Sequence, residues 1–275
     1  MVILYILLAV LCGILALSII LGLLYLFVFV RPRGRSPETP SLLCDYAHRG
    51  LHGDSTPENS LAAFESACRA GYGIELDVQL SSDGEVMVFH DYTLIRMTGK
   101  EGKLCDFTAE ELQKISLGGT DQTIPRFSEV LALVNGRVPI LVELKGEDLN
   151  AELCPKAAAL LKDYRGDYCI ESFNPLLLRA MRKELPAAYY GQLYTNVCKD
   201  KKKVTLLNIL LTLMAFNFLA RPDFIAYNTL YRQSLPVKLT TKLYTAERFV
   251  WTVRDRKTLT LARESGEHPI FERIR

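Results

Sequence analysis

The sequence predicts an α/β protein: a TIM-type (β/α)8 barrel at residues 42–275, preceded by one N-terminal transmembrane helix at residues 1–30. Two observations support this prediction. The first 30 residues carry no charged side chain, short strand-like runs alternate with helical patterns in the rest of the chain, and this alternation is typical of a parallel sheet covered by helices. A linker rich in Pro, Ser and Gly, residues 31–41, marks the boundary.

The N-terminal segment reads MVILYILLAVLCGILALSIILGLLYLFVFV. At about 1.5 Å per residue it exceeds the roughly 30 Å of hydrocarbon in a bilayer. A cleaved signal peptide is the alternative, but it would have a shorter apolar stretch, a basic segment before it and a small-residue cleavage site after it. Three cations, Arg31, Arg33 and Arg35, follow the helix. The positive-inside rule therefore predicts a single-pass protein of the cell membrane with a cytoplasmic domain.

The barrel prediction depends on eight strand-like runs, at 42–48, 73–79, 86–90, 139–145, 168–172, 188–193, 223–227 and 249–253. Helical patterns lie between most of them, at 58–70, 108–115 (with a Thr108/Glu111 capping box), 128–134, 151–163 and 175–184. One connection, SSDGE at 81–85, is too short for a helix, and its Asp-Gly pair is typical of a hairpin. We therefore expect the barrel to be irregular around its second and third strands.

Composition excludes some classes of function. The formal net charge is +2, and no basic stretch is interleaved with aromatic residues, so we expect no nucleic-acid partner. The cysteines of the predicted barrel form no C-x-x-C pair and no zinc-like spacing, which suits unpaired thiols in a reducing compartment.

Acidic residues interrupt two of the predicted strands. Side chains alternate along a strand, so Glu75 and Asp77 share one face while their apolar neighbours share the other. The same alternation sets Glu143 on one face of the run at 139–145. Three carboxylates in one barrel interior need a cation, and oxygen-rich sites are those that Mg²⁺ and Ca²⁺ prefer. We interpret the three as ligands of one divalent metal ion; the alternative is buried ion pairs with Arg49 and Lys145.

Two histidines supply proton-transfer chemistry. His48 and His90 each follow a strand-like run, the position at which barrel enzymes carry their catalytic residues. An imidazole with an unperturbed pKa of about 6.5 accepts and donates protons near neutral pH. Arg49 can bind a phosphate with its planar fork, and Lys145 adds a point charge. Metal, histidines and these cations together predict phosphoryl transfer.

The segments AHRGLH, PENSLAAF and GIELDVQLSSDGEVMVFHD, followed by VELK, ESFNP, WTV and IFE, resemble the glycerophosphodiester phosphodiesterase family from about residue 44 to the end. The resemblance implies a TIM barrel, one divalent metal ion on Glu75, Asp77 and Glu143, and acid-base histidines at His48 and His90. It also implies phosphate contacts from Arg49 and Lys145, and a role for Glu58 in the PEN motif, where a glutamate after proline is otherwise an ordinary helix-opening residue. Two departures, Arg254 after WTV and an apolar insertion at 204–219, put the substrate in question.

The expected reaction is hydrolysis of a glycerophosphodiester to glycerol 3-phosphate and an alcohol. Phe173 and Trp251 lie near strand ends, where they could pack on the glycerol carbons or form ordinary core. Two alternatives are open: hydrolysis of lyso-phospholipids in the manner of a lysophospholipase D, and a non-catalytic, membrane-tethered module that binds phosphodiesters.

A second membrane-directed segment spans residues 199–220. Four lysines, at 199 and 201–203, precede a strongly apolar run at 204–219. As one helix this run would expose more apolar surface than a barrel can cover, and lysines at a helix N-terminus oppose its dipole. We expect an interfacial element that contacts anionic lipid; a dimer interface or a well-covered barrel helix is the alternative.

Overall fold

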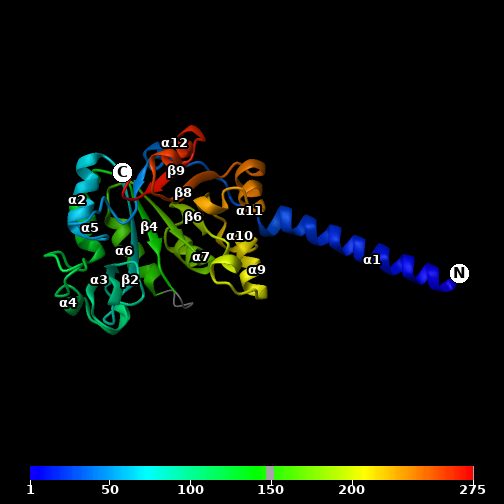
Figure 1. Ribbon diagram of the computed structural model, residues 1–275, viewed down its shortest axis with the longest axis horizontal. Helices are drawn as coiled ribbons and strands as arrows, with labels where there is room; N and C mark the ends of the chain where they lie inside the picture. The colour runs from blue at the N-terminus through cyan, green and yellow to red at the C-terminus, as the bar shows by residue number, and fades with distance from the viewer. Residues whose placement is uncertain (147–151, 275) are drawn as a thin grey trace.

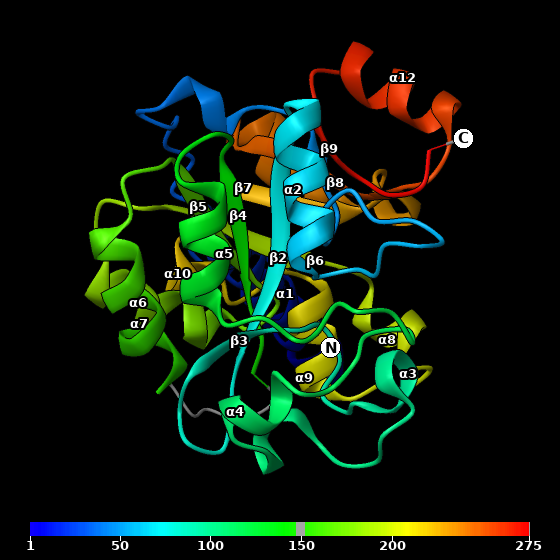
Figure 2. The same cartoon turned by 90° about the vertical axis from the view of Figure 1, so that its left-hand side faces the viewer.

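The computed structural model describes residues 1–146 and 152–274. Within these residues the sheet has nine strands, and all but β3 run parallel and close into a barrel, because β1 pairs with both β2 and β9. Helices surround this barrel (Figure 1 and Figure 2), so the predicted fold class is confirmed. The barrel strands are β1 (Tyr46–Ala47), β2 (Gly73–Leu80), β4 (Ile140–Leu144), β5 (Tyr168–Ser172), β6 (Tyr189–Tyr194), β7 (Phe224–Asn228), β8 (Glu247–Val253) and β9 (His268–Phe271).

One predicted barrel strand lies outside the barrel. The run at 86–90 forms β3 (Val86–Val88), which pairs antiparallel with the end of β2. Gly84, with a φ of +79°, makes the turn of this hairpin, as the Asp-Gly pair indicated. The eighth barrel strand is β9 instead, which the sequence prediction missed because Pro269 weakens its strand pattern.

The helices follow the predicted pattern with shifted ends. α7 has the predicted bounds, and Thr108 and Glu111 form the predicted capping box at α4. The helix predicted from Glu58 begins at Leu61, because Ser60 caps it and leaves Glu58 in the preceding turn. Residue 151, predicted to begin a helix, lies outside the described residues. The remaining bounds are α2 (Leu61–Ala70), α3 (Ile95–Thr98), α4 (Ala109–Leu112), α5 (Phe127–Val134), α6 (Leu153–Asp163), α7 (Pro175–Glu184), α8 (Val197–Asp200), α11 (Leu235–Lys238) and α12 (Arg256–Glu264).

Aromatic rings fill one end of the barrel interior. Phe224 stacks on Tyr189 and Phe249, with ring centroids 5.0 and 4.3 Å apart, and all three side chains are buried. Tyr46, with no exposed surface, packs beside Phe249. These aromatic rings occupy the end of the barrel where the strands begin. The polar residues of the interior therefore lie where the strands end, as is usual for the active sites of such barrels.

The N-terminal helix is joined firmly to the barrel. α1 (Val2–Leu24) continues as a π-helical turn, and residues 2–29 form an apolar helix long enough for a membrane span or a signal sequence, with a mean hydropathy of 3.0. The next residue, Val30, is fully buried, and its carbonyl accepts a hydrogen bond of 2.8 Å from Asn217. Figure 1 shows α1 projecting from the barrel flank beside α10 and α11.

The apolar run at 204–219 is not one helix. It forms α9 (Leu206–Thr212) and α10 (Asn217–Ala220), because Met214 adopts a left-handed φ of 51° that interrupts the helical path. The expectation of a single helix is therefore wrong. Each of the two helices is far too short to cross a bilayer.

Candidate active site

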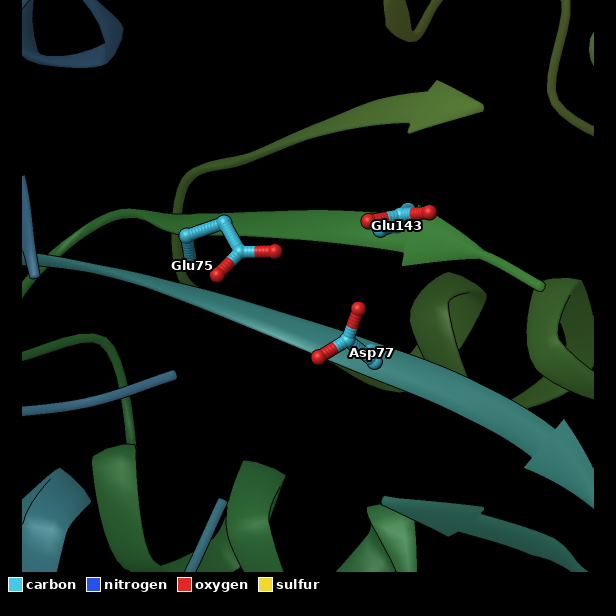
Figure 3. Close-up of side chains that lie close together, drawn as sticks. All are labelled: Glu75, Asp77 and Glu143. Carbon is cyan, nitrogen blue, oxygen red and sulfur yellow. The ribbon is translucent and has the colours of Figure 1, made fainter. Parts of the chain in front are cut away.

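Three carboxylates meet inside the barrel near the strand ends. Glu75 and Asp77 project from β2, and Glu143 projects from β4 on the same side (Figure 3). The parallel register pairs Asp77 with Glu143, which accounts for their proximity. One carboxylate oxygen from each lies within 4.8 Å of the other two, and all three residues are buried. The fold therefore places Glu75, Asp77 and Glu143 close together, as the sequence predicted.

Electrostatics favour a cation among these groups. Burial raises the pKa of Glu75 well above its usual value, and the charges of Asp77 and Glu143 raise it further. Burial also raises the pKa of Glu143 to about 7, although Lys145 opposes the shift. Two of the three carboxyl groups, Glu75 and Glu143, thus have raised pKa values. A cluster of carboxyl oxygens with this property fits a hard divalent ion, because such an ion offsets both burial and mutual repulsion.

The ion pairs of the alternative interpretation are present as well. The Nζ atom of Lys145 lies 2.6 Å from Glu143 and 3.0 Å from Asp77, and Nε of Arg49 lies 3.6 Å from Asp77. Burial alone would raise the pKa of Asp77, but Lys145, His90 and Arg49 outweigh it and hold that pKa well below its usual value. These cations therefore compensate Asp77 more fully than its two neighbours.

A fourth carboxylate, Glu171, adds to the excess of acid. It lies on β5 in register with Glu143, is buried, and leaves Oε2 without a hydrogen-bond partner. Burial raises its pKa well above the usual value, and the charges of Glu75 and Glu143 add to this. Sequence reasoning missed it, although it alternates along its strand in the same way as Glu143.

His48 is oriented by a carboxylate from the last strand. Its Nδ1 atom lies 2.8 Å from Oε2 of Glu272, directly after β9, and its Nε2 atom lies 3.9 Å from Glu75. A hydrogen bond at Nδ1 fixes the ring so that Nε2 is available to the acidic cluster. Burial lowers the pKa of His48, although the hydrogen bond that its ring donates to Glu272 opposes this shift. Glu272 was not predicted; the acid that ends the IFE motif was its only signal.

His90 has an equivalent partner. Its Nδ1 atom lies 2.6 Å from Asp91, the next residue, which in turn pairs with Arg96. Arg96 also binds Glu58 at 2.6 Å, and Glu58 binds Arg49 at 2.6 Å. Glu58 therefore links two arginines and does not line the cavity described below. Burial lowers the pKa of His90, against the effect of Asp77.

A cavity of about 170 Å³ opens at this cluster. Phe173 and Trp251 form part of its wall, edge to face, with ring centroids 5.6 Å apart. Asp77 does not line this cavity; it accepts a 2.8 Å hydrogen bond from Asn59, a residue that the prediction missed. The other predicted site residues that line the cavity are His48, Arg49, Glu75, His90, Glu143 and Lys145, and Arg254 joins them.

Comparison with known proteins identifies a family for this chain. The profile of the Glycerophosphoryl diester phosphodiesterase family matches residues 48–272. A glycerophosphodiester phosphodiesterase of Caldanaerobacter subterraneus subsp. tengcongensis is 38% identical over 159 residues, which are 54% of this chain and 65% of that protein. The first three curated relatives are matched over only 43% to 65% of their own lengths.

Solved structures show the same fold. An Oleispira antarctica phosphodiesterase, in complex with the product sn-glycerol-3-phosphate, superposes with a TM-score of 0.68 at 22% identity, covering 83% of this chain and 92% of that one. A glycerophosphodiester phosphodiesterase of Thermotoga maritima gives a TM-score of 0.61 at 25% identity, covering 83% and 94%. From the length of the profile match, the chain belongs to the glycerophosphoryl diester phosphodiesterase family.

Proposed function

We propose that the protein hydrolyses glycerophosphodiesters to glycerol 3-phosphate and an alcohol, with one divalent ion, Mg²⁺ or Ca²⁺, held by Glu75, Asp77 and Glu143. The observation that carries this proposal is the shared cavity: both histidines line it together with Glu75 and Glu143, and each histidine is held at Nδ1 by its own carboxylate. That arrangement leaves the Nε2 atom of each ring for proton transfer.

The mechanism follows from the positions of these groups. Glu75, Asp77 and Glu143 would hold the divalent ion, which would supply positive charge to offset the negative charge of the phosphate. Arg49 and Lys145, which line the same cavity, bind and orient the phosphate oxygens. One histidine accepts the proton of the nucleophile, and the other donates a proton to the leaving alcohol oxygen. The nucleophile is either water, which gives glycerol 3-phosphate directly, or the neighbouring glycerol hydroxyl, which gives a cyclic phosphate that water then opens. Phe173 and Trp251 exclude water from one wall and pack on the glycerol carbons.

A non-catalytic binding module explains the site less well. A binder needs cations for the phosphate, but it does not need two histidines that are each positioned by a carboxylate. A lyso-phospholipid is a second candidate substrate, because apolar side chains line cavities next to Phe173.

The test uses the full chain in detergent, with glycerophosphocholine as substrate. We expect release of glycerol 3-phosphate that stops with a chelator and returns with Mg²⁺ or Ca²⁺. A Leu261→Gln variant, altered on the exposed surface of α12, serves as a control for substitution alone. Binding of glycerophosphocholine without hydrolysis in any metal would identify a binding module instead.

We further propose that residues 1–30 span the cell membrane once, with the barrel on the cytoplasmic side, and that residues 199–220 contact the lipid surface. The polar residues of this segment are turned toward the protein: Asn208 is buried and donates to the carbonyl of Lys203, and Thr212 accepts from the backbone of Cys198. The apolar residues at the start of the segment point outward, with Val204 75% and Leu206 73% exposed, whereas Met214 and Ala215 are buried.

Buried polar residues and exposed apolar residues are the reverse of the usual arrangement at a surface in water, and they suit a surface in contact with lipid. Its lysines lie where anionic head groups would meet them. α10 also contacts the end of the membrane helix, with the rings of Phe29 and Phe218 5.5 Å apart. The segment would therefore lie near the bilayer whenever α1 spans it. These contacts favour lipid over a dimer partner as its covering.

A fluorescence experiment tests the lipid contact in the intact chain. A polarity-sensitive dye on Leu206→Cys should shift to the blue in liposomes and be quenched by lipid-borne quenchers, more strongly with anionic lipid. The same dye on Leu261→Cys of α12 should stay solvent-exposed. Equal spectra for the two positions would refute the contact, and a spectrum that depends on protein concentration would indicate a dimer interface.

A further inference from the structure

We propose that an apolar groove between α7 and α9 holds the acyl chain of a monoacylated glycerophosphodiester, a lyso-phospholipid, while its phosphodiester lies in the catalytic cavity. The proposal rests on the proposed hydrolysis of glycerophosphodiesters and names a substrate class for it.

The groove has a volume of about 560 Å³. Its size lies within the range of roughly 300 to 1,000 Å³ that is usual for sites of small organic ligands. Its lining includes one charged side chain, Lys201, among the described residues. The rest is mainly apolar and includes Leu176, Leu207, Leu211, Phe216 and Leu219. Such a lining binds hydrocarbon, because apolar surface is removed from water on both sides of the contact.

One aromatic ring connects the groove to the site. Phe173 lines the groove, the catalytic cavity, and a further cavity of about 320 Å³ between them. That intermediate cavity is also lined by His90, Glu143 and Lys145. Phe173 is 40% exposed, so it is not simply a core residue. A ligand with its phosphodiester at the histidines can therefore extend past Phe173 into the groove without leaving the surface of the protein.

The position of the groove favours a lipid over a water-soluble diester. Glycerol and a small polar head group offer nothing to an apolar groove beyond Phe173. One wall of the groove comes from α9, whose Leu206 points outward beside the groove residue Leu207. Both α9 and α10 lie on the side of the barrel from which α1 projects (Figure 1). An acyl chain leaving a bilayer there would reach the groove with little exposure to water.

The test compares substrates of increasing chain length on the full chain in detergent. The substrates are glycerophosphocholine and its monobutanoyl, monohexanoyl and monooctanoyl esters, each used at concentrations where it is monomeric. Leu207→Gln makes the groove polar, and Leu207→Trp fills it. Leu207 is 57% exposed, so neither change should unfold the chain. Leu206→Gln is the matched control, because this neighbour on the same helix lines none of the cavities described above.

We expect kcat/KM of the wild type to rise with chain length, reaching about tenfold or more for the octanoyl ester over glycerophosphocholine, because each buried methylene adds to binding. Both Leu207 variants should lower the octanoyl value about tenfold and leave the glycerophosphocholine value within about twofold. Leu206→Gln should change neither value.

Two outcomes overturn the acyl-chain site while the proposed function stands. One is inertness of the octanoyl ester beside an active glycerophosphocholine, and the other is an equal loss of kcat/KM on both substrates in the Leu207 variants. Inertness toward all substrates would refute the proposed function and the acyl site together. Hydrolysis of the acylated esters without hydrolysis of glycerophosphocholine would support the acyl-chain site and restrict the substrate class to lyso-phospholipids.

Discussion

At the scale of single residues, the buried acids of the candidate site are expected to lower the stability of the metal-free protein. Without metal, Glu75, Glu143 and Glu171 are buried acids whose pKa values are all raised. Buried acids that are arranged for a ligand commonly lower the stability of the empty protein. The ligand then restores stability because it binds only the folded state.

Replacement of Glu143 should therefore separate stability from function. Its folded pKa is raised to about 7, above the roughly 4.3 of an unfolded glutamate. Between these values the folded state binds more protons, so the metal-free protein should lose stability as pH rises from about 4.3 to about 7. Glu143→Gln should flatten this dependence of Tm and raise the metal-free Tm at pH 7, while abolishing activity.

Thermal unfolding in chelator across this pH range provides the measurement. Added Mg²⁺ or Ca²⁺ should raise the Tm of the wild type at pH 7 and have little effect on the variant. The interpretation fails if the variant is the less stable protein at pH 7, because Glu143 would then serve chiefly as the partner of Lys145.

Glu272 should act as a positioning residue for His48. Glu272→Gln keeps the side-chain shape but removes the charge that favours one orientation and protonation of the ring. By analogy with other carboxylates that orient histidines, kcat should fall on the order of 10- to 100-fold with KM little changed. His48→Ala and His90→Ala should each lower kcat on the order of 100- to 10,000-fold.

Arg254→Gln provides the comparison, because Arg254 contacts Glu272 from the exposed side. Arg254→Gln should lower kcat less than Glu272→Gln does. Glu272→Asp, which keeps the carboxylate, should retain part of the activity. A purely structural role for Glu272 would instead lower Tm in proportion to the lost activity, and would leave the pH profile of kcat unshifted.

At the scale of secondary structure, the sequence predicted strands and the faces of their side chains correctly where the local pattern agrees with the tertiary packing. The acids of β2 and β4 alternate with apolar residues, so the sequence was sufficient to place Glu75, Asp77 and Glu143 on one face. Asn59 and Glu272 were not predictable, because each joins the site through a contact between distant segments. β9 was missed for a related reason: its barrel position depends on pairing with β1 and β8, not on its own short pattern.

Gly191 shows how closely two elements meet inside the barrel. A Cβ atom at this position in β6 would lie 2.1 Å from the ring of Phe224, which is itself held between Tyr189 and Phe249. Because the ring cannot move away, Gly191→Ala should destabilise the protein by about 1 to 3 kcal/mol. Gly99→Ala, at an exposed turn with no atom within 4 Å of the added Cβ, controls for the loss of a glycine.

Thermal unfolding of the two variants is the measurement. The Gly99 variant carries a backbone cost of its own, since Gly99 has a φ of +71°. A double variant, Gly191→Ala with Phe224→Leu, should recover part of the stability by making room for the methyl group. If Gly191→Ala unfolds no earlier than the wild type, the barrel interior is less tightly packed than these contacts indicate.

At the scale of the whole molecule, the N-terminal helix and the barrel form one unit. Arg33 and Arg35, which predicted the topology, lie 3.8 and 3.7 Å from the fully buried Asp223. The backbone of Arg33 also donates to the carbonyl of Pro222. These cations hold the linker against the folded barrel, whereas the proposed topology would depend on their charge during membrane insertion. The two roles do not conflict.

The cytoplasmic orientation can be tested with thiols. Cys105 is an exposed residue of the barrel domain and a free thiol. If residues 1–30 span the membrane with the barrel inside, an impermeant maleimide should label Cys105 only after the cells are permeabilised, and Cys105→Ser should remove that signal. Val2→Cys, at the opposite end of α1, should be labelled in intact cells. The reverse pattern would place the barrel outside and the lipid contact of residues 199–220 on the outer leaflet, where fewer anionic head groups would meet its lysines.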